Sequence, residues 1–260
     1  MKALVLAAGY GTRLHPLTTH TAKPLLPLGG KAIVEYLVEQ LDGIAEIDRI
    51  DIVTNDRFAA AFERWARRAQ GATPIAVVND GTTSNEERLG AIGAMHYVVT
   101  SRGIDEALLV VGGDQAYTFD FGEFVRFFHG HGSSVALHRI RDPEAIKRYS
   151  EVRLDGRGRI VEFREKPAVP RYELCATCLY LYTPADVGRI GEYLESGGNR
   201  DAPGYYVGWL HTRADVYGYE FAGPWFDIGD RAVYDEADRF FTERGAPCRN
   251  TDGQEGHSRR

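Results

Sequence analysis

The regular alternation of two kinds of segment constrains the fold of the first half of this chain more than any other feature. Short apolar runs, of the length and composition of buried strands, lie at residues 2–6, 49–53, 74–78 and 107–111. Between them, apolar side chains recur every three to four residues at 33–41, 58–69 and 89–99, which predicts helices. Strands that alternate with helices typically form a parallel sheet covered on both faces.

The second half predicts a different arrangement, because its strand-like runs follow one another closely, at 134–138, 151–154, 160–164 and 175–182. The segment Asp155-Gly156-Arg157-Gly158 between two of them is a hairpin turn signal. Further helices are predicted after Pro184 and at 231–244. We therefore expect an α/β fold with a mixed, mostly parallel sheet flanked by helices and an added antiparallel part.

We expect one domain over residues 1–244, because no linker or repeat interrupts them and this length can bury a core without disulfides. Residues 245–260 lack apolar content and are predicted to be a disordered tail. The three cysteines are an odd count that fits a reducing compartment, so we expect a cytoplasmic protein. Cys175 and Cys178 have no second pair to complete a zinc site, which favours buried structural thiols.

Charge and hydropathy exclude two classes of partner. The chain has 31 Lys and Arg against 37 Asp and Glu, a net charge of −6, whereas nucleic-acid binders normally carry a basic excess. Its longest apolar runs are much shorter than the roughly 18 residues that a membrane span requires. We therefore expect neither nucleic acid nor membrane as a partner.

The first predicted strand runs into a segment with almost no side-chain bulk, Ala7-Ala8-Gly9-Tyr10-Gly11. Backbone N–H groups in such a loop can closely approach a base edge or a phosphate. The segment lacks the third glycine of a dinucleotide-binding motif and the Gly-Lys-Ser/Thr of a P-loop. Taken alone, the glycines are equally typical of a tight turn.

Two cations bracket the proline-containing loop that follows. Arg13 and Lys23 are spaced so that both could fold over one polyphosphate.

Together, residues 6–28 closely resemble the signature of the sugar-1-phosphate nucleotidylyltransferases. The resemblance covers about residues 1–242 and recurs in the expected order at Val110-Val-Gly-Gly-Asp114, Phe163-Arg-Glu-Lys166-Pro167 and Trp225-Phe-Asp227-Ile-Gly229. It implies a Rossmann-like nucleotidyltransferase fold and an enzyme that joins a nucleoside triphosphate to a sugar 1-phosphate.

The resemblance also implies roles for individual residues. In the family, nucleotide is bound by the residues that match Leu6, Ala7, Ala8, Gly9, Gly11, Thr12 and Gly113. The positions of Arg13 and Lys23 contact the phosphates, those of Asp114 and Asp227 hold Mg²⁺, and that of Lys166 binds the acceptor phosphate beside Glu165. The implied catalytic residues are thus Arg13, Lys23, Asp114 and Lys166. The attacking phosphate is already ionised at neutral pH, so no general base is expected.

Three segments match the family less well. Asn79, Gly81 and Thr83 are expected near the base, and Arg88 near a phosphate or the sugar, although Ser84 and Glu87 also fit a helix cap that starts there. Cys178 stands where many relatives carry glycine beside the sugar. Gln115 follows Asp114 where asparagine is common.

The resemblance favours dTTP as donor and leaves GTP, UTP and CTP open. Two other functions stay open: transfer to a non-sugar phosphate such as phosphocholine or a phosphonate, and a catalytically silent nucleotide-binding regulatory subunit. A homo-oligomer is also left open.

Overall fold

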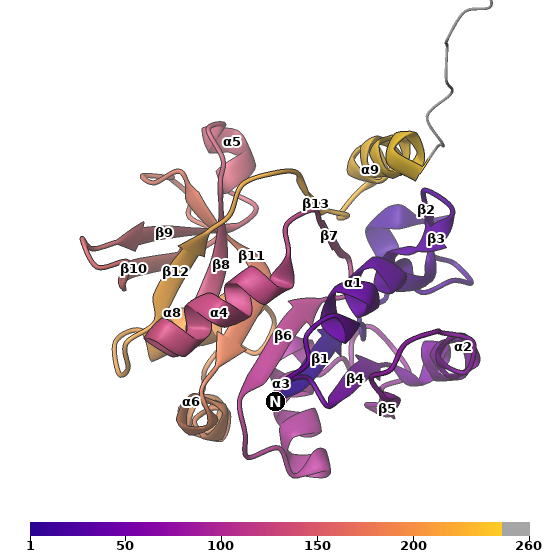
Figure 1. The fold of residues 1–260 in the computed structure, drawn as a ribbon, viewed down its shortest axis with the longest axis horizontal. Coiled ribbons are helices and arrows are strands. Elements are labelled where there is room, and N and C mark those ends of the chain that lie inside the picture. Colours follow the sequence, from indigo (N-terminus) through magenta and orange to yellow (C-terminus); the bar gives the residue numbers. More distant parts are fainter. Residues whose placement is uncertain (246–260) are drawn as a thin grey trace, which may run out of the picture.

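The computed structural model describes residues 1–245, which are built around one nine-stranded mixed sheet (Figure 1). Its parallel part has β1 (Lys2–Leu6) between β4 (Arg49–Thr54) and β6 (Leu108–Gly112), with β5 (Ile75–Asn79) outside β4. The chain passes between these strands through α1 (Ile33–Asp42), α2 (Asp56–Ala66) and α3 (Gly90–Arg102). The predicted alternation of strands and helices is confirmed.

The second half extends the sheet with antiparallel strands. β11 (Leu174–Tyr182) pairs antiparallel with β6, β8 and β9. β9 (Ser150–Leu154) and β10 (Ile160–Glu165) form the predicted hairpin, and β8 (Ser134–Arg139) also pairs parallel with β12 (Tyr217–Glu220). The expected mixed sheet with an added antiparallel part is therefore confirmed.

The remaining elements are short or peripheral. The helices are α4 (Phe121–His131), α5 (Pro143–Ile146), α6 (Pro184–Gly188), α7 (Ile190–Glu195), α8 (Pro203–Leu210) and α9 (Arg231–Gly245). Two small antiparallel ladders are β2 (Pro27–Leu28) with β3 (Lys31–Ala32), and β7 (Gln115–Tyr117) with β13 (Trp225–Asp227). Within residues 1–245, no helix is both long and apolar enough to cross a membrane.

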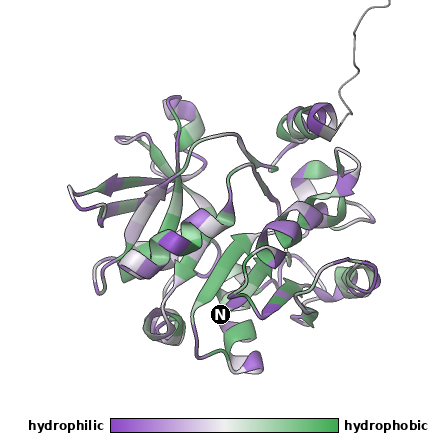
Figure 2. Ribbon diagram, in the orientation of Figure 1, coloured by the Kyte–Doolittle hydropathy of each residue, from purple (hydrophilic) through white to green (hydrophobic). Residues whose placement is uncertain are grey.

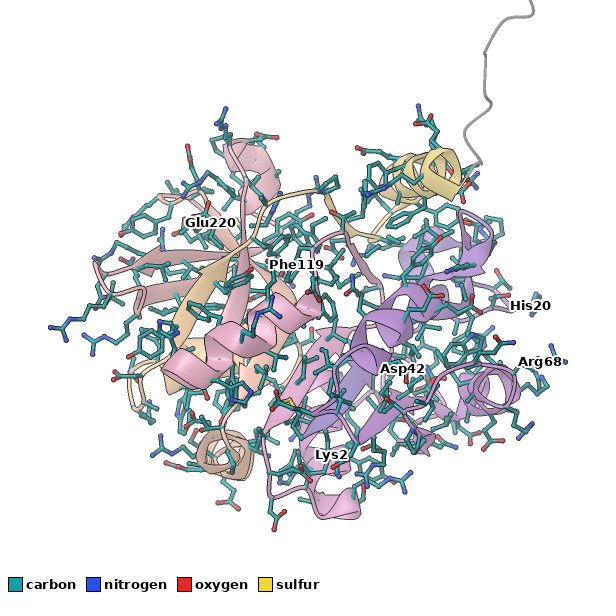
Figure 3. All side chains as sticks on the ribbon, in the orientation of Figure 1. Lys2, His20, Asp42, Arg68, Phe119 and Glu220 are labelled. Carbon is teal, nitrogen blue, oxygen red and sulfur yellow. The ribbon has the colours of Figure 1, made fainter. Side chains whose placement is uncertain are left out.

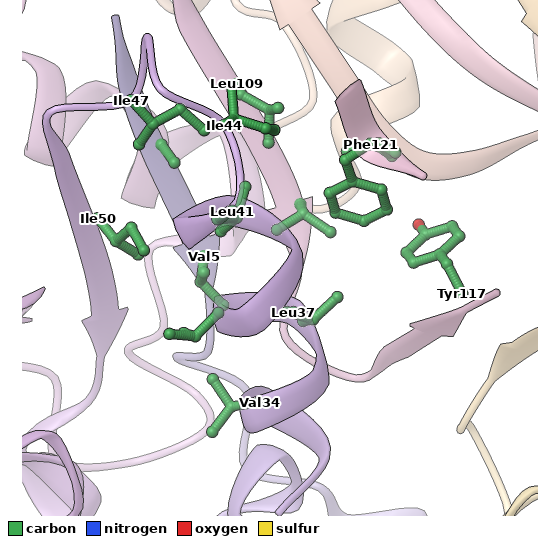
Figure 4. Close-up of a cluster of buried hydrophobic side chains, with 14 of the residues drawn as sticks. Val5, Val34, Leu37, Leu41, Ile44, Ile47, Ile50, Leu109, Tyr117 and Phe121 are labelled. Carbon is green, nitrogen blue, oxygen red and sulfur yellow. The ribbon is translucent and has the colours of Figure 1, made fainter. Parts of the chain in front are cut away.

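Both faces of the parallel strands are buried, because successive side chains of a strand point to opposite faces. Val5 packs on one face with Val34, Leu37 and Leu41 of α1 (Figure 4), while Leu4 packs on the other in the cluster that includes α3. Apolar residues accordingly dominate β1 and β6 in Figure 2. Burying one such side chain stabilises the fold by about 1.5–3 kcal/mol.

An aromatic cluster joins β7 and the segment after it to this core. Tyr117 packs edge-on against Phe121, with ring centroids 5.3 Å apart, and Phe119 stacks on Phe221 at 4.2 Å. Phe119 is buried, whereas His20 and Arg68 are exposed at the periphery (Figure 3). The β7 strand that follows Asp114 is thus anchored by packing.

The predicted tail lies, apart from Gly245, outside the described residues, as does Cys248.

Candidate active site

A cavity of about 270 Å³ opens at the carboxyl ends of the parallel strands, the edge where ligands bind in open α/β sheets. Its apolar wall is formed by Leu6, Val53, Leu89, Ala91 and Ala94, and its polar groups come from Asp80, Arg88, Asp114 and Asp201. A smaller hollow of about 60 Å³ shares Leu6, Gly9 and Asp114 with it and is also lined by Ala7, Gly11, Lys23 and Pro24. The two spaces are therefore adjacent.

The glycine-containing loop is held by contacts from other parts of the chain. Asn55 donates its side-chain amide to the Ala8 carbonyl at 2.9 Å, and Thr18 donates its hydroxyl to the Gly11 carbonyl at 2.7 Å. Gly11 has a φ of 63°, a left-handed conformation that favours glycine. A Cβ on Gly9 would meet no atom within 4 Å, so the backbone there faces open space. Thr12 and Arg13 follow in a short 3-10 turn and are exposed.

Gly113 brings the end of β6 against the end of β1. Its N–H donates to the Leu6 carbonyl at 2.9 Å, and a Cβ at this position would lie 2.9 Å from that same oxygen. Because Gly113 permits this close approach, Asp114 comes to the edge of the cavity.

A network of hydrogen bonds joins the two candidate metal-binding carboxylates. Lys23 Nζ contacts Asp114 Oδ2 at 2.8 Å. The Gln115 amide donates to Asp114 Oδ1 at 3.0 Å and to Asp227 Oδ1 at 2.8 Å. Asp114 and Asp227 are therefore close neighbours, separated by one bridging amide, although they are far apart in the sequence.

The two carboxylates differ electrostatically. Burial would raise the pKa of Asp114, but the adjacent Lys23 and hydrogen bonds from Lys23 and Gln115 lower its pKa overall. Burial and the neighbouring Asp114 charge raise the pKa of Asp227 to about 6. Arg13 lies at the same end of the site, because its guanidinium is 3.8 Å from where a Cβ of Gly229 would stand, and its charge partly opposes this increase.

The chemistry of this pair fits Mg²⁺. Repulsion between two adjacent carboxylates is relieved by a cation. Mg²⁺ is usually bound by one or two carboxylates, with waters and substrate phosphates completing its coordination. Among residues 1–245, no group of three or more His, Cys, Asp or Glu side chains forms a metal site.

Glu165 ends β10 and Lys166 follows it, and neither residue lines the two spaces. Lys166 has a φ of 46°, donates its backbone N–H to the Tyr149 carbonyl at 2.8 Å, and exposes its side chain. Glu165 accepts a hydrogen bond from the Ser150 hydroxyl, and burial raises the pKa of its carboxyl. A Cβ on Gly204 of α8 would lie 2.0 Å from Glu165 Oε2, so this glycine makes room for the carboxyl.

Cys178 lines the large cavity from β11, where the strand register shifts. Its φ of 57° is left-handed, a conformation that favours glycine, and its sulfur lies 2.9 Å from where a Cβ of Gly112 would stand. Burial and the carboxylates of Asp114 and Asp227 raise the pKa of its thiol. Cys175 is fully buried.

The loop after β5 is arranged differently from the expected pattern. Asp80 lines the cavity, whereas Asn79, Gly81 and Thr83 are not among its lining residues. The Asn79 side chain bonds Asp56 and the Gly81 N–H, and Thr83 bonds Glu87. Arg88 does line the cavity and forms an ion pair with Asp201, with Nη2 and Oδ1 3.1 Å apart.

The helix cap predicted at Ser84 is wrong, because α3 begins at Gly90. Its first N–H groups, those of Ala91 and Ile92, donate to the carbonyls of Asp201 and Arg200.

The structure thus brings Leu6, Ala7, Ala8, Gly9, Gly11, Lys23, Arg88, Asp114 and Cys178 to the two adjacent spaces, with Asp227 joined to them through Gln115. Gln115 and Asp80 were not predicted as site residues. The only sequence signal for Gln115 was its place directly after Asp114.

Comparisons with known proteins identify the family and the fold. Residues 2–244 match the nucleotidyl transferase family. The fold is similar to that of a protein from Bacillus anthracis described as a glucose-1-phosphate thymidylyltransferase and solved with sucrose, with a TM-score of 0.76, 23% identity, and coverage of 94% of this chain and 96% of that one. It is also similar to a UDP-glucose pyrophosphorylase solved with UDP-glucose, with a TM-score of 0.78, 21% identity, and coverage of 94% and 98%.

The match extends over nearly the whole described chain and confirms the resemblance drawn from the motifs. The chain belongs to the nucleotidyl transferase family.

Proposed function

We propose that this protein is a Mg²⁺-dependent enzyme that transfers a nucleoside monophosphate from a nucleoside triphosphate to a sugar 1-phosphate and releases pyrophosphate. The observation that carries the proposal is the network of Lys23, Asp114, Gln115 and Asp227 at the edge of the cavity. It combines a cation, a carboxylate pair and a glycine loop at the place where a triphosphate would lie. The relatives described as a glucose-1-phosphate thymidylyltransferase and a UDP-glucose pyrophosphorylase favour a sugar phosphate as acceptor.

The triphosphate would occupy both spaces. The apolar wall of the larger cavity suits the flat face of a base. The smaller hollow, between Gly9, Gly11 and Lys23, offers backbone and one cation to the phosphates. The exposed Arg13 is close enough to the carboxylate pair to add a second cation.

Asp114 and Asp227 would hold Mg²⁺, which supplies charge neutralisation for the phosphates when bound. Lys23 favours the ionised form of Asp114, because its ammonium contacts Oδ2 of that carboxylate and lowers its pKa. The pair therefore offers a negatively charged carboxylate, that of Asp114, to a cation.

Lys166 would bind the phosphate of the acceptor, since its side chain is exposed beside the half-buried Glu165. An oxygen of that phosphate would form a bond to the α-phosphorus as the bond between this phosphorus and the β-phosphate oxygen breaks. The attacking oxygen is already ionised, so the chain needs to orient it and balance charge without removing a proton.

The test is pyrophosphate release over a grid of dTTP, UTP, GTP and CTP against several sugar 1-phosphates, with phosphocholine and a phosphonate as further acceptors. We expect turnover with a sugar 1-phosphate, most strongly with dTTP, and its loss with excess chelator. Turnover restricted to phosphocholine or the phosphonate would show that the acceptor is a non-sugar phosphate and not a sugar 1-phosphate. Binding of triphosphate without turnover would indicate a silent subunit.

A further inference from the structure

Gln115 occupies a central place between the candidate metal ligands. It opens β7, is only 4% exposed, and pairs with Asp227 in the ladder between β7 and β13. Its side-chain nitrogen donates to one oxygen of Asp114 and one oxygen of Asp227, at 3.0 and 2.8 Å. Its side-chain oxygen accepts a hydrogen bond from Trp225 Nε1 at 2.8 Å.

These partners allow only one orientation of the amide. An indole N–H can only donate, and an ionised carboxylate can only accept. The Gln115 oxygen must therefore face Trp225, and its NH₂ group must face the two carboxylates. Both amide hydrogens and the amide oxygen have partners, so a flipped amide would lose all three hydrogen bonds.

Trp225 is itself fixed by packing. Its ring lies 5.1 Å from that of Tyr149 and 5.7 Å from that of His138, measured between centroids. The orientation of the amide is thus determined by a packed aromatic group as well as by the carboxylates.

We propose that Gln115 is a positioning residue that sets the spacing and orientation of Asp114 and Asp227 for a divalent cation, and that Trp225 locks it in place. This inference rests on the proposed function, because it concerns the same cation site. By engaging one oxygen of each carboxylate, the amide holds both side chains in fixed rotamers despite their mutual repulsion. Residues that orient metal ligands in this way commonly change metal affinity by about 10–100-fold when replaced.

A competing explanation predicts the opposite change in metal affinity when the Gln115 amide is removed. If the amide only substitutes for a cation in the empty pair, removing it would free the carboxylate oxygens and strengthen metal binding. If it positions the carboxylates, removing it leaves two mobile, repelling groups and weakens binding.

The first experiment measures Mn²⁺ binding to the full chain by electron paramagnetic resonance, with Mg²⁺ as competitor and no nucleotide present. We expect Gln115→Leu to weaken Mn²⁺ binding by about 10–100-fold. The control is Thr118→Val, which removes a 3.0 Å hydrogen bond to the Pro224 carbonyl at the end of the ladder between β7 and β13, without touching the carboxylates. It should bind Mn²⁺ as the wild type does.

Trp225→Phe provides a second, milder variant, because it keeps an aromatic ring and removes only the N–H that orients the amide. We expect Trp225→Phe to lose less Mn²⁺ affinity than Gln115→Leu. The double variant should bind Mn²⁺ as weakly as Gln115→Leu alone, because Trp225 acts through the amide. Mg²⁺ should also change the indole emission of the wild type, and this change should vanish in Trp225→Phe and shrink in Gln115→Leu.

Unchanged or tighter Mn²⁺ binding in a folded Gln115→Leu variant, with wild-type binding intact, would overturn the positioning role and leave the proposed function standing. A wild-type chain that binds neither ion, even after addition of triphosphate, would contradict the metal assignment itself. Additive losses from Trp225→Phe and Gln115→Leu would overturn the proposed lock.

Discussion

The proposed phosphate side of the site comes from one segment, between Leu6 and Leu25, whereas the proposed acceptor side is assembled from β10, β11 and α8. On the phosphate side, Gly11 provides the left-handed conformation and Gly9 leaves open space. On the acceptor side, two residues with side chains, Lys166 and Cys178, have positive φ values of 46° and 57°. Such conformations cost about 1–3 kcal/mol each and persist only where the surrounding structure determines them.

The difference teaches that the two sides depend on the fold to different degrees. The phosphate side follows from one short segment at the end of a strand. The acceptor side needs Gly204 to make room for Glu165, and Gly112 to make room for Cys178. Changes on the phosphate side should therefore act mainly on chemistry, and those on the acceptor side on stability as well.

The largest expected effect comes from the carboxylate pair. Asp114→Asn and Asp227→Asn keep the shape of the side chain and remove one charge, which should lower turnover by about 100-fold or more, or about 3 kcal/mol, by analogy with loss of other transition-state contacts. Turnover at saturating Mg²⁺, with the thermal midpoint measured alongside, tests this. Near-wild-type turnover in either variant would contradict the role of the pair.

Asp227→Asn also tests how the charge of Asp227 affects stability at different pH values when chelator keeps metal away. Because the folded-state pKa of Asp227 is raised to about 6, ionisation of this group opposes folding as pH rises above its unfolded value near 3.8, with the full effect above about 6. In chelator, Asp227→Asn should therefore melt above the wild type at pH 7 and show little advantage at pH 4. A wild-type melting temperature that exceeds the variant's at pH 7 would contradict this.

Gly204→Ala should destabilise the acceptor side by about 1–3 kcal/mol, because the new Cβ would overlap Glu165 Oε2 and the Ser150 hydroxyl. Gly208→Ala is the matched control on the same helix, since its Cβ would meet Phe163 at an ordinary 3.6 Å. That change should be neutral or stabilise by up to about 1 kcal/mol. Urea denaturation measures the free energy of unfolding of both variants. Equal stabilities of Gly204→Ala and Gly208→Ala would contradict this prediction.

The smallest expected effect concerns Cys178. Its left-handed backbone predicts that Cys178→Gly is more stable than Cys178→Ala by about 1 kcal/mol, the reverse of the usual order in a strand. Cys175, in the same strand with a φ that is not positive, should show the usual order, with alanine the more stable. Denaturant unfolding of the four variants checks this, and the same order at both positions would rule out strain at Cys178.

The alternating half of the fold could be predicted because each strand and helix is encoded by a local pattern. The α4 helix was missed although Phe121, Phe124, Val125 and Phe128 have helical spacing and are buried. Phenylalanine and valine also favour strands, and the glycines within the segment lower its helix propensity, so the local signal was ambiguous.

The candidate site was predictable where the motif is contiguous and less so where partners are distant. Gln115 contacts residues 112 and 110 positions away, Asp227 and Trp225, and no local pattern encodes such contacts. The start of α3 agrees with the helix predicted at 89–99. Gly90 packs against the Arg200 carbonyl and begins the helix, and the alternative cap at Ser84 is not formed.

The division of the site into a nucleotide side and an acceptor side is tested most directly by Lys166→Ala, with triphosphate affinity measured by calorimetry and acceptor kcat/KM measured by pyrophosphate release. Loss of one charge-assisted hydrogen bond should lower acceptor kcat/KM by about 10–100-fold and leave triphosphate affinity within about twofold. Lys147→Ala, an exposed lysine paired with Glu144 on α5, is the control and should change neither value. A collapse of triphosphate affinity with unchanged acceptor kinetics would contradict the account.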